Sequence, residues 1–201
     1  MRRRTLIGAL GAAALVSAVP GPGRAGYDIG TALEPRTIGS PSARLVLIEY
    51  FSLTCSHCAR FHTETWPQLR DTYVVPGHLL VELRDFPLDL LALRAAALAR
   101  CLPKQRYAPM IDLLLKQQAS WATSGEGEAA LVRLARLAGM DEETARGCMN
   151  DRDLLEGIGK MQRTAQAEHG VDATPTFVLN GERLAAFTFE EFDEALSDAL
   201  R

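Results

Sequence analysis

The feature that most constrains the fold is an apolar run followed closely by a Cys-x-x-Cys motif. Residues 45–51 read Leu-Val-Leu-Ile-Glu-Tyr-Phe, and Cys55 and Cys58 follow after a short connection. A run this apolar predicts a strand covered on both faces, as in a sheet flanked by helices. Two residues between the cysteines allow a small disulfide ring at the start of a helix. The sequence therefore predicts a strand that leads directly into a redox-active helix N-terminus.

A helix N-terminus favours the thiolate form of a cysteine placed there. Unpaired backbone N–H groups and the helix dipole stabilise the negative charge. The thiolate is the species that attacks a disulfide, so Cys55 is the expected nucleophile and Cys58 is expected to close the ring. A purely structural role is disfavoured, because a ring this small restricts the unfolded chain very little.

The same motif is half of many zinc sites. His57 could join Cys55 and Cys58 as a third ligand, but three ligands on one helical turn form an awkward tetrahedron. Cys101 and Cys148 belong to no second Cys-x-x-Cys motif. Thiol–disulfide chemistry is therefore the favoured interpretation, with no metal or organic cofactor. A secreted metal-binding protein remains the alternative from another class.

Residues 1–25 have the pattern of a secretory signal peptide. Three arginines at positions 2–4 precede an apolar stretch over residues 6–19, and Ala25 offers a small residue for cleavage. The paired arginines fit a twin-arginine signal as well as an ordinary Sec signal. We expect export to the periplasm, where disulfides are permitted.

The charge balance limits the partners. Cleavage after residue 25 would remove four arginines and no acid, so the formal charge would change from −3 to −7. An acidic surface argues against nucleic acid or anionic lipid as the main partner. The remaining chain is long enough for one core with an inserted subdomain.

Strand signals occur at both ends of the chain and are absent between them. The predicted strands are residues 45–51, residues 78–86 and a hairpin over residues 176–187, whose turn is Asn180-Gly181. Residues 26–43 are rich in Gly, Pro and Ser and indicate an irregular arm. The expected helices are 55–73 with a kink or a restart at Pro67, 90–101, 107–118, 126–138, a short helix after Asp141, 153–169, and a final helix capped by Thr188 and Glu191.

This order of elements, with Thr174-Pro175-Thr176, resembles the thioredoxin fold, and the helical block resembles the insertion of the DsbA branch of secreted thiol oxidoreductases. Residues 51–59, 86–89 and 97–101 are similar to DsbA-type enzymes of alphaproteobacteria. The resemblance covers essentially residues 40–200. It implies an α/β thioredoxin fold with an inserted all-helical subdomain. The implied division is signal peptide 1–25, thioredoxin-fold domain 26–87, helical subdomain 88–157 and second thioredoxin-fold part 158–201.

The resemblance also implies roles near the motif. His57 would donate towards the Cys55 thiolate and stabilise the reduced state; the alternative is a solvent-facing helical histidine. The usual proline between the first cysteine and the histidine is replaced here by Ser56. Because this dipeptide tunes the redox potential, the substitution leaves the oxidising strength open.

Three further residues take roles from the resemblance. Pro175 would be the cis-proline opposite Cys55, and Thr174 would present its backbone to an extended substrate. Glu49 would be a buried proton acceptor below Cys58. The alternatives are an ordinary trans-proline and an outward-facing strand acid.

The remaining cysteines and histidines lie outside the motif. In an exported protein, a second disulfide between Cys101 and Cys148 is favoured over two buried free thiols. His62, His78 and His169 show no metal-ligand spacing. We expect all three histidines at the surface.

The implied function is donation of disulfides to folding exported proteins through Cys55 and Cys58, by a monomer. A DsbB-like membrane quinone oxidoreductase would reoxidise the pair. The alternative within the class is a disulfide isomerase or reductase kept reduced by a membrane partner. Isomerases of this superfamily commonly dimerise through an added N-terminal domain, and residues 26–43 are too short for one.

Overall fold

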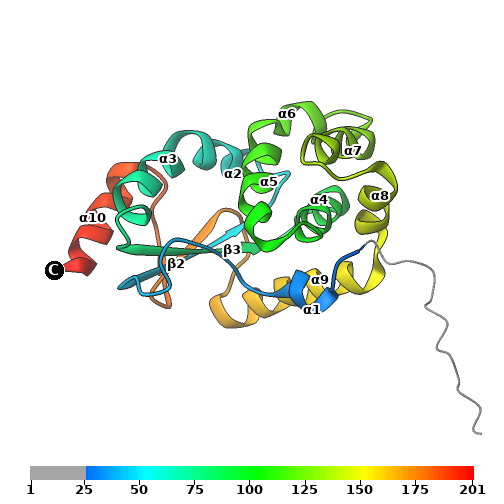
Figure 1. Cartoon of the computed structure of the whole chain (residues 1–201). Coiled ribbons are helices and arrows are strands. Elements are labelled where there is room, and N and C mark those ends of the chain that lie inside the picture. Colours follow the sequence, from blue (N-terminus) through cyan, green and yellow to red (C-terminus); the bar gives the residue numbers. More distant parts are fainter. Residues whose placement is uncertain (1–25) are drawn as a thin grey trace, which may run out of the picture.

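A mixed sheet forms the centre of the computed structural model, which describes residues 26–201 (Figure 1). The signal peptide predicted for residues 1–25 lies outside the described residues. The sheet has five strands in the order β1-β3-β2-β4-β5 within residues 26–201. Their bounds are β1 Arg36–Ile38, β2 Leu45–Phe51, β3 Leu79–Asp85, β4 Thr176–Leu179 and β5 Glu182–Leu184.

The central strand β2 runs parallel to β3 and antiparallel to β4. Both of its faces are covered, as its apolar sequence predicts. Ile48 and Tyr50 join a small apolar cluster with Ala165 of α9 (Arg152–His169), whereas Leu47 and Phe51 belong to the main core on the opposite face. Figure 1 shows α9 below the sheet and the remaining large helices above it.

The segment after β2 is helical almost without a break. It consists of α2 (Ser56–Arg60), η1 (Phe61–Thr65), α3 (Trp66–Leu69) and η2 (Arg70–Val74), in which η marks π-helical turns. Pro67 lies in the first turn of α3. The helical segment continues past this proline to Val74, as the sequence predicts. With α10 (Phe189–Leu200), this segment covers the upper face of the sheet in Figure 1.

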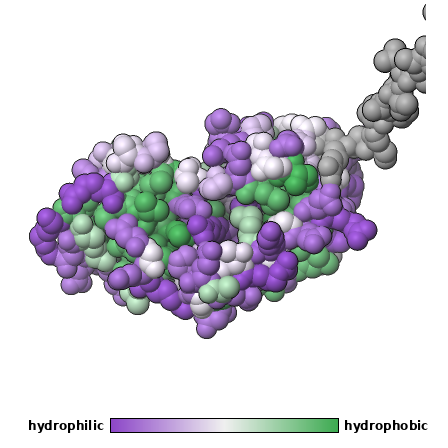
Figure 2. Space-filling view, turned by 90° about the horizontal axis from the view of Figure 1, so that it is seen from below, coloured by the Kyte–Doolittle hydropathy of each residue, from purple (hydrophilic) through white to green (hydrophobic). Residues whose placement is uncertain are grey.

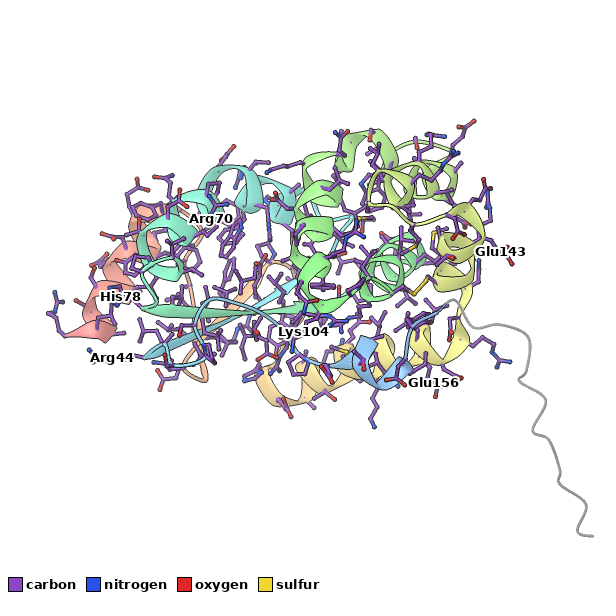
Figure 3. The ribbon with its side chains drawn as sticks, in the orientation of Figure 1. Arg44, Arg70, His78, Lys104, Glu143 and Glu156 are labelled. Atoms are coloured by element: carbon purple, nitrogen blue, oxygen red, sulfur yellow. A yellow bond between two sulfur atoms is a disulfide. The ribbon has the colours of Figure 1, made fainter. Side chains whose placement is uncertain are left out.

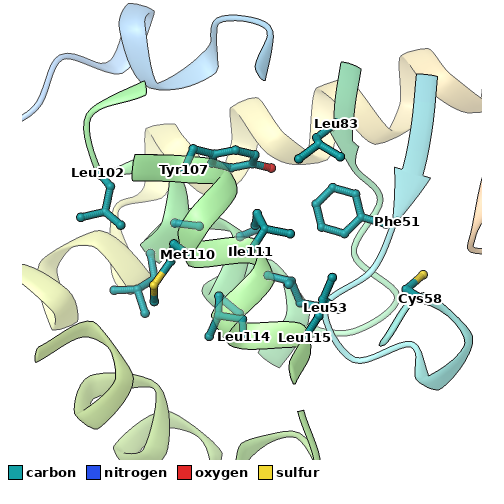
Figure 4. Close-up of a cluster of buried hydrophobic side chains, with 14 of the residues drawn as sticks. Phe51, Leu53, Cys58, Leu83, Leu102, Tyr107, Met110, Ile111, Leu114 and Leu115 are labelled. Carbon is teal, nitrogen blue, oxygen red and sulfur yellow. The ribbon is translucent and has the colours of Figure 1, made fainter. Parts of the chain in front are cut away.

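The helical block between β3 and β4 packs against the end of the sheet. It contains α4 (Leu90–Arg100), α5 (Lys104–Lys116), α6 (Gln118–Trp121), α7 (Gly127–Leu137) and α8 (Glu142–Asn150). Figure 4 shows α5 directing Ile111, Leu114 and Leu115 towards Phe51 and Leu53, beside the buried Cys58. The block and the predicted redox segment therefore share one core.

Cys101 and Cys148 form a disulfide that links the C-terminal end of α4 to α8, with their Cα atoms 6.2 Å apart. The predicted second disulfide is confirmed, and its yellow S–S bond can be followed in Figure 3. The predicted subdomain boundary at residue 157 falls inside the continuous helix α9. The division into domains stays a prediction.

The arm predicted to be irregular is partly regular, which corrects the sequence interpretation. Residues 26–43 contain α1 (Ile29–Leu33), capped by the Asp28 side chain, and the short strand β1, which pairs with β3. A three-residue strand is too short to show an alternating pattern in sequence. The second strand of the hairpin is also shorter than predicted, because β5 ends at Leu184.

On the face seen in Figure 2, hydrophobic areas lie among hydrophilic side chains. Within residues 26–201, none of the helices combines the length and the apolar character needed to span a bilayer. The polar side chains labelled in Figure 3 are all exposed: Arg44, Arg70, His78, Lys104, Glu143 and Glu156.

Candidate active site

Cys55 is the N-cap residue of α2, at the point where the chain leaves the sheet. Its backbone is extended, with φ −78° and ψ 118°, and its carbonyl oxygen accepts the first helical hydrogen bond, from Ala59 N at 3.1 Å. The loop before it is closed by a hydrogen bond from Cys55 N to Ser52 O, also 3.1 Å long. The predicted strand–loop–helix arrangement therefore places the first cysteine at a helix N-terminus.

The two cysteines of the motif are free thiols with different exposure. The relative exposure is 8 % for Cys55 and 0 % for Cys58. The Cys55 Sγ lies 3.2 Å from the carbonyl oxygen of Thr174. This contact places the turn before β4 opposite the first cysteine, as the resemblance implies. The peptide bond between Thr174 and Pro175 is cis.

The surroundings of Cys55 lower its pKa to about 5, chiefly because the Cys58 thiol donates a hydrogen bond to its sulfur. Burial opposes this shift. The Thr174 side chain and the backbone N–H groups of Cys58 and His57 add further stabilisation of the thiolate. The buried Thr174 hydroxyl has no other hydrogen-bond partner among the described residues, so it is available to donate to the thiolate. At pH 7 a thiol with such a pKa is about 99 % thiolate, whereas a thiol with a pKa near 9 is only about 1 % thiolate.

Cys58 shows the opposite behaviour. Burial raises its pKa far above the ordinary value, and the hydrogen bond to Cys55, the Cys55 charge and the Glu49 charge act in the same direction. The pair therefore has one sulfur that is a stable thiolate and one that holds its proton. This division is what thiol–disulfide exchange through Cys55 requires.

His57, the third residue of the motif, has an exposed side chain. Its ring meets the Phe187 ring edge-on, with centroids 6.3 Å apart, and its backbone N–H stabilises the Cys55 thiolate. The predicted donation from the His57 ring to the sulfur stays a prediction.

Glu49 and His62 form a buried contact, which corrects the prediction that His62 is a surface residue. The two side chains are 1 % and 2 % exposed, and His62 Nε2 lies 3.0 Å and 3.2 Å from the two Glu49 carboxylate oxygens. His62 follows Cys58 by four residues, so both face the sheet. His169, also expected at the surface, is half-buried. Its Nδ1 lies 2.8 Å from the Tyr50 hydroxyl oxygen.

A groove of about 490 Å³ opens beside the motif. It runs along Pro175 and the start of β4 on one side and along β5 and the segment after it on the other, and His57 of the motif also lines it. Its wall combines apolar and charged side chains: His57, Pro175, Arg183, Ala186, Phe187 and Glu191.

The helical block holds the active-site loop through two contacts that sequence reasoning missed. Gln118 Nε2 donates to the carbonyl oxygens of Leu53 and Cys55 at 2.8 Å and 2.9 Å. The Thr54 hydroxyl donates to Asp89 at 2.6 Å. Both contacts join residues more than thirty positions apart, and no local sequence signal marks such pairs.

The metal-binding alternative requires a cluster of ligand side chains. In the described part of the chain, residues 26–201, no group of three or more His, Cys, Asp or Glu side chains is placed to hold a metal ion.

The family can be stated from the match of the chain to a family model. The model described as Thioredoxin matches residues 31–198, and the chain belongs to this thioredoxin family. Within it, the fold is that of the DsbA-like thiol–disulfide oxidoreductases, with the helical block inserted before the last helix and hairpin.

Solved structures and curated relatives agree with this assignment. The chain is similar to alpha-DsbA1 of Wolbachia pipientis, with 26 % identity, a TM-score of 0.76, and coverage of 82 % of this chain and 90 % of that one. It is similar to a protein-disulfide isomerase of Novosphingobium aromaticivorans, with 26 % identity, a TM-score of 0.72, and coverage of 83 % and 98 %. A Rickettsia bellii protein named "Putative protein-disulfide oxidoreductase" is 27 % identical over 164 residues, 81 % of this chain and 63 % of that protein. The match thus spans less than two thirds of that relative's length.

Proposed function

We propose that this protein is a periplasmic thiol–disulfide oxidoreductase that donates disulfides to folding exported proteins. The observation that carries the proposal is the contrast within the motif: Cys55 has a pKa of about 5, whereas burial raises the pKa of Cys58. A stable thiolate favours the reduced enzyme, so the oxidised enzyme gives up its disulfide readily. The names of the similar proteins support the same class.

The proposed reaction starts from a Cys55–Cys58 disulfide. A substrate thiolate attacks the Cys55 sulfur, the bond between the two cysteines breaks, and its electron pair goes to the Cys58 sulfur. A second substrate thiolate then attacks the substrate sulfur of the mixed disulfide, and Cys55 leaves as a thiolate. The substrate gains a disulfide, and Cys55 and Cys58 end reduced. The low pKa of Cys55 makes it a good leaving group in the second step.

Neighbouring residues would hold the substrate and handle the proton. The Thr174 backbone and the groove beside Pro175 would receive an extended substrate segment. Glu49 would exchange a proton with Cys58, since its charge already influences that thiol. His57 would add positive charge near the Cys55 thiolate when its ring is protonated.

The partners and the location follow from the same proposal. The substrates would be reduced exported proteins with cysteines, and a DsbB-like quinone-linked membrane oxidoreductase would remove the electrons. The predicted signal over residues 1–25 supports export to the periplasm, by the Sec or the twin-arginine route. We propose that the protein acts as a monomer.

A disulfide isomerase is the second candidate, because one structurally similar protein carries that name. An isomerase must stay reduced and attack wrong disulfides, whereas an oxidase must lose its own disulfide easily. The stabilised thiolate favours the oxidase.

The deciding experiment has two parts. Equilibration with glutathione would give the potential of the Cys55–Cys58 pair, expected to be strongly oxidising. Oxidised protein should accelerate refolding of a reduced, denatured disulfide substrate, and reduced protein should do little with a scrambled one. A Cys55→Ala variant is the inactive control. Strong unscrambling by the reduced protein, with a dimeric mass in light scattering, would reverse the assignment.

A further inference from the structure

The pairing of β2 with β3 continues into the two loops that follow these strands. The last paired residues of the strands are Phe51 and Asp85. Beyond them, Phe86 N donates to Phe51 O at 2.7 Å, and Leu88 N donates to the Ser52 hydroxyl oxygen at 3.3 Å. The loop that leads to the motif therefore lies alongside the loop that leads to α4.

Asp89 makes the next contact of this series. It is the N-cap residue of α4, where its Oδ1 accepts a hydrogen bond from Ala92 N at 2.7 Å. Its Oδ2 accepts from the Thr54 hydroxyl at 2.6 Å, a distance typical of a hydroxyl that donates to a carboxylate. One carboxylate thus joins the first turn of α4 to the residue that precedes Cys55.

The residues on both sides of Thr54 are also held by the helical block. Gln118 donates to the carbonyl oxygens of Leu53 and Cys55 at 2.8 Å and 2.9 Å. The Leu53 side chain is buried, and Figure 4 shows it beside α5. Thr54 lies between these two residues, and its own side chain is bound to Asp89. Three consecutive residues before α2 are therefore each fixed by a contact with the helical block.

The position of Cys55 decides which groups reach its sulfur. Its thiolate is stabilised by the Cys58 thiol, by Thr174 and by the backbone N–H groups of Cys58 and His57. Hydrogen bonds weaken steeply when their geometry departs from the ideal, so a displaced Cys55 would lose part of each one. Asp89 itself is exposed, so its contact with the loop adds little to the overall stability. Its effect lies in where it holds the nucleophile.

We propose that Asp89 is a positioning residue for Cys55, which it holds at the start of α2 through the hydroxyl of Thr54. The proposal rests on the proposed function and deepens it, because it names a residue of the helical block that sets the reactivity of the nucleophile. Thr54 transmits the constraint, since its side chain is bound to Asp89 and its backbone continues into Cys55. Loss of this contact destabilises the Cys55 thiolate and makes the disulfide of the motif harder to reduce.

The test variants separate the contact from the charge of Asp89. Thr54→Val removes the hydroxyl, keeps the shape of the side chain and changes no charge, whereas Thr54→Ser keeps the donor. Asp89→Asn keeps the helix cap and can still reach Thr54 through its amide, so it measures the effect of the negative charge alone. Thr144→Val is the matched control, because the Thr144 hydroxyl donates to Asp141, the N-cap residue of α8, at 2.9 Å and outside the active-site loop.

Two quantities are measured for each variant. The pH dependence of alkylation by iodoacetamide gives the pKa of Cys55, and equilibration with glutathione gives the redox equilibrium constant of the motif. In Thr54→Val the Cys55 pKa should rise from about 5 by about 0.5 pH unit, so the alkylation rate at pH 5 should fall about twofold. The equilibrium constant should shift about threefold towards the disulfide form. Thr54→Ser and Thr144→Val should stay near the wild type, and Asp89→Asn should show no rise of the Cys55 pKa.

A contact that only supports the fold would lower the urea stability of Thr54→Val and leave the Cys55 pKa and the equilibrium constant unchanged. That result overturns the proposal, as does an equal rise of the Cys55 pKa in Thr54→Ser or in Thr144→Val. Should Thr54→Val fail to fold, Asp89→Ser decides the question, because serine keeps the helix cap but is too short to reach Thr54. Its Cys55 pKa should exceed that of Asp89→Asn, and equal values overturn the proposal.

The proposed function can fail separately from this proposal. A wild-type protein that exchanges no thiol with glutathione would refute the proposed function. The comparison of the Cys55 pKa among the variants does not depend on that exchange, since alkylation needs only the free thiol.

Discussion

The Nε2 atom of Gln118 lies 2.9 Å from the carbonyl oxygen of Cys55 and donates to it. The same amide donates to Leu53 O, so one side chain of α6 fixes the loop on both sides of Thr54. The helical block is therefore in direct contact with the nucleophilic residue, and its sequence can tune the redox site.

Replacing Gln118 with Glu should raise the pKa of Cys55. The carboxylate cannot donate to the two carbonyl oxygens and places negative charge near the sulfur, which disfavours a thiolate by on the order of one pH unit. The measurement is the pH dependence of Cys55 alkylation by iodoacetamide. Gln118→Ala and Gln117→Glu separate the loss of the hydrogen bonds from the added charge, since Gln117 is exposed. An equal rise of the Cys55 pKa in Gln117→Glu would mean that the added negative charge, and not the loss of the two hydrogen bonds, causes the change.

Replacing Cys58 with Ala should raise the Cys55 pKa from about 5 more than any other single change at the site, because the Cys58 hydrogen bond is the main cause of the low value. Cys58→Ser keeps a hydroxyl donor and should raise it less. His57→Gln keeps the backbone N–H and should have the smallest effect. The check is absorbance of the thiolate near 240 nm during a pH titration. A larger shift in His57→Gln than in Cys58→Ala would assign the stabilisation to the imidazole instead.

The stability of the reduced protein relative to the oxidised protein should rise with pH between about 5 and 9. In this range the unfolded chain keeps the Cys55 proton and the folded chain has lost it, so a higher pH favours folding. The contribution is lost as the pH falls through the folded pKa of about 5. The slope should reach about 1.4 kcal/mol per pH unit. Urea unfolding of both redox forms at several pH values measures the difference, and a flat difference would contradict the low pKa.

Elements set by local chemistry could be predicted from the sequence. The Asn180-Gly181 turn forms because both residues adopt positive φ, 49° and 93°. The capping box of Thr188 and Glu191 is present as predicted, with both reciprocal hydrogen bonds. The placement of Cys55 at a helix start follows in the same way, from an apolar strand and a short loop.

Contacts between distant segments could not be predicted in this way. His62 lies in a helical segment whose buried face has no strict period, because η1 is π-helical. Its partner Glu49 could equally have faced solvent in an isolated strand. Gln118 reads as an ordinary helix-surface residue until the fold brings α6 to the active-site loop. Such pairs depend on tertiary packing, and one sequence carries no signal for them.

Replacing Cys101 and Cys148 with Ser should destabilise the protein without stopping the proposed exchange reaction. The disulfide joins two residues 47 positions apart, at the end of α4 and in α8, and chain entropy predicts about 4 kcal/mol for a loop of this length. Cys55 and Cys58 lie in a separate segment and make no disulfide to either residue. Urea unfolding should show the loss, and glutathione equilibration should give an unchanged potential for the motif. A large change in that potential would show that the helical block controls the redox pair through this bond.

Replacing Arg100 with Met should cost about 3–5 kcal/mol, because it leaves a buried carboxylate without its partner. Arg100 Nε lies 2.5 Å from Asp85 Oδ2, and its Nη1 donates to Ala32 O at 2.8 Å, so it links α4 to β3 and to α1. The Tyr107 hydroxyl also donates to Asp85, at 2.9 Å. Asp85→Asn combined with Arg100→Met removes the unpaired charge and should recover part of the loss. Urea unfolding of the single and double variants measures the loss of unfolding free energy and its partial recovery. A loss below about 1 kcal/mol in Arg100→Met would show that the pair acts like a surface ion pair.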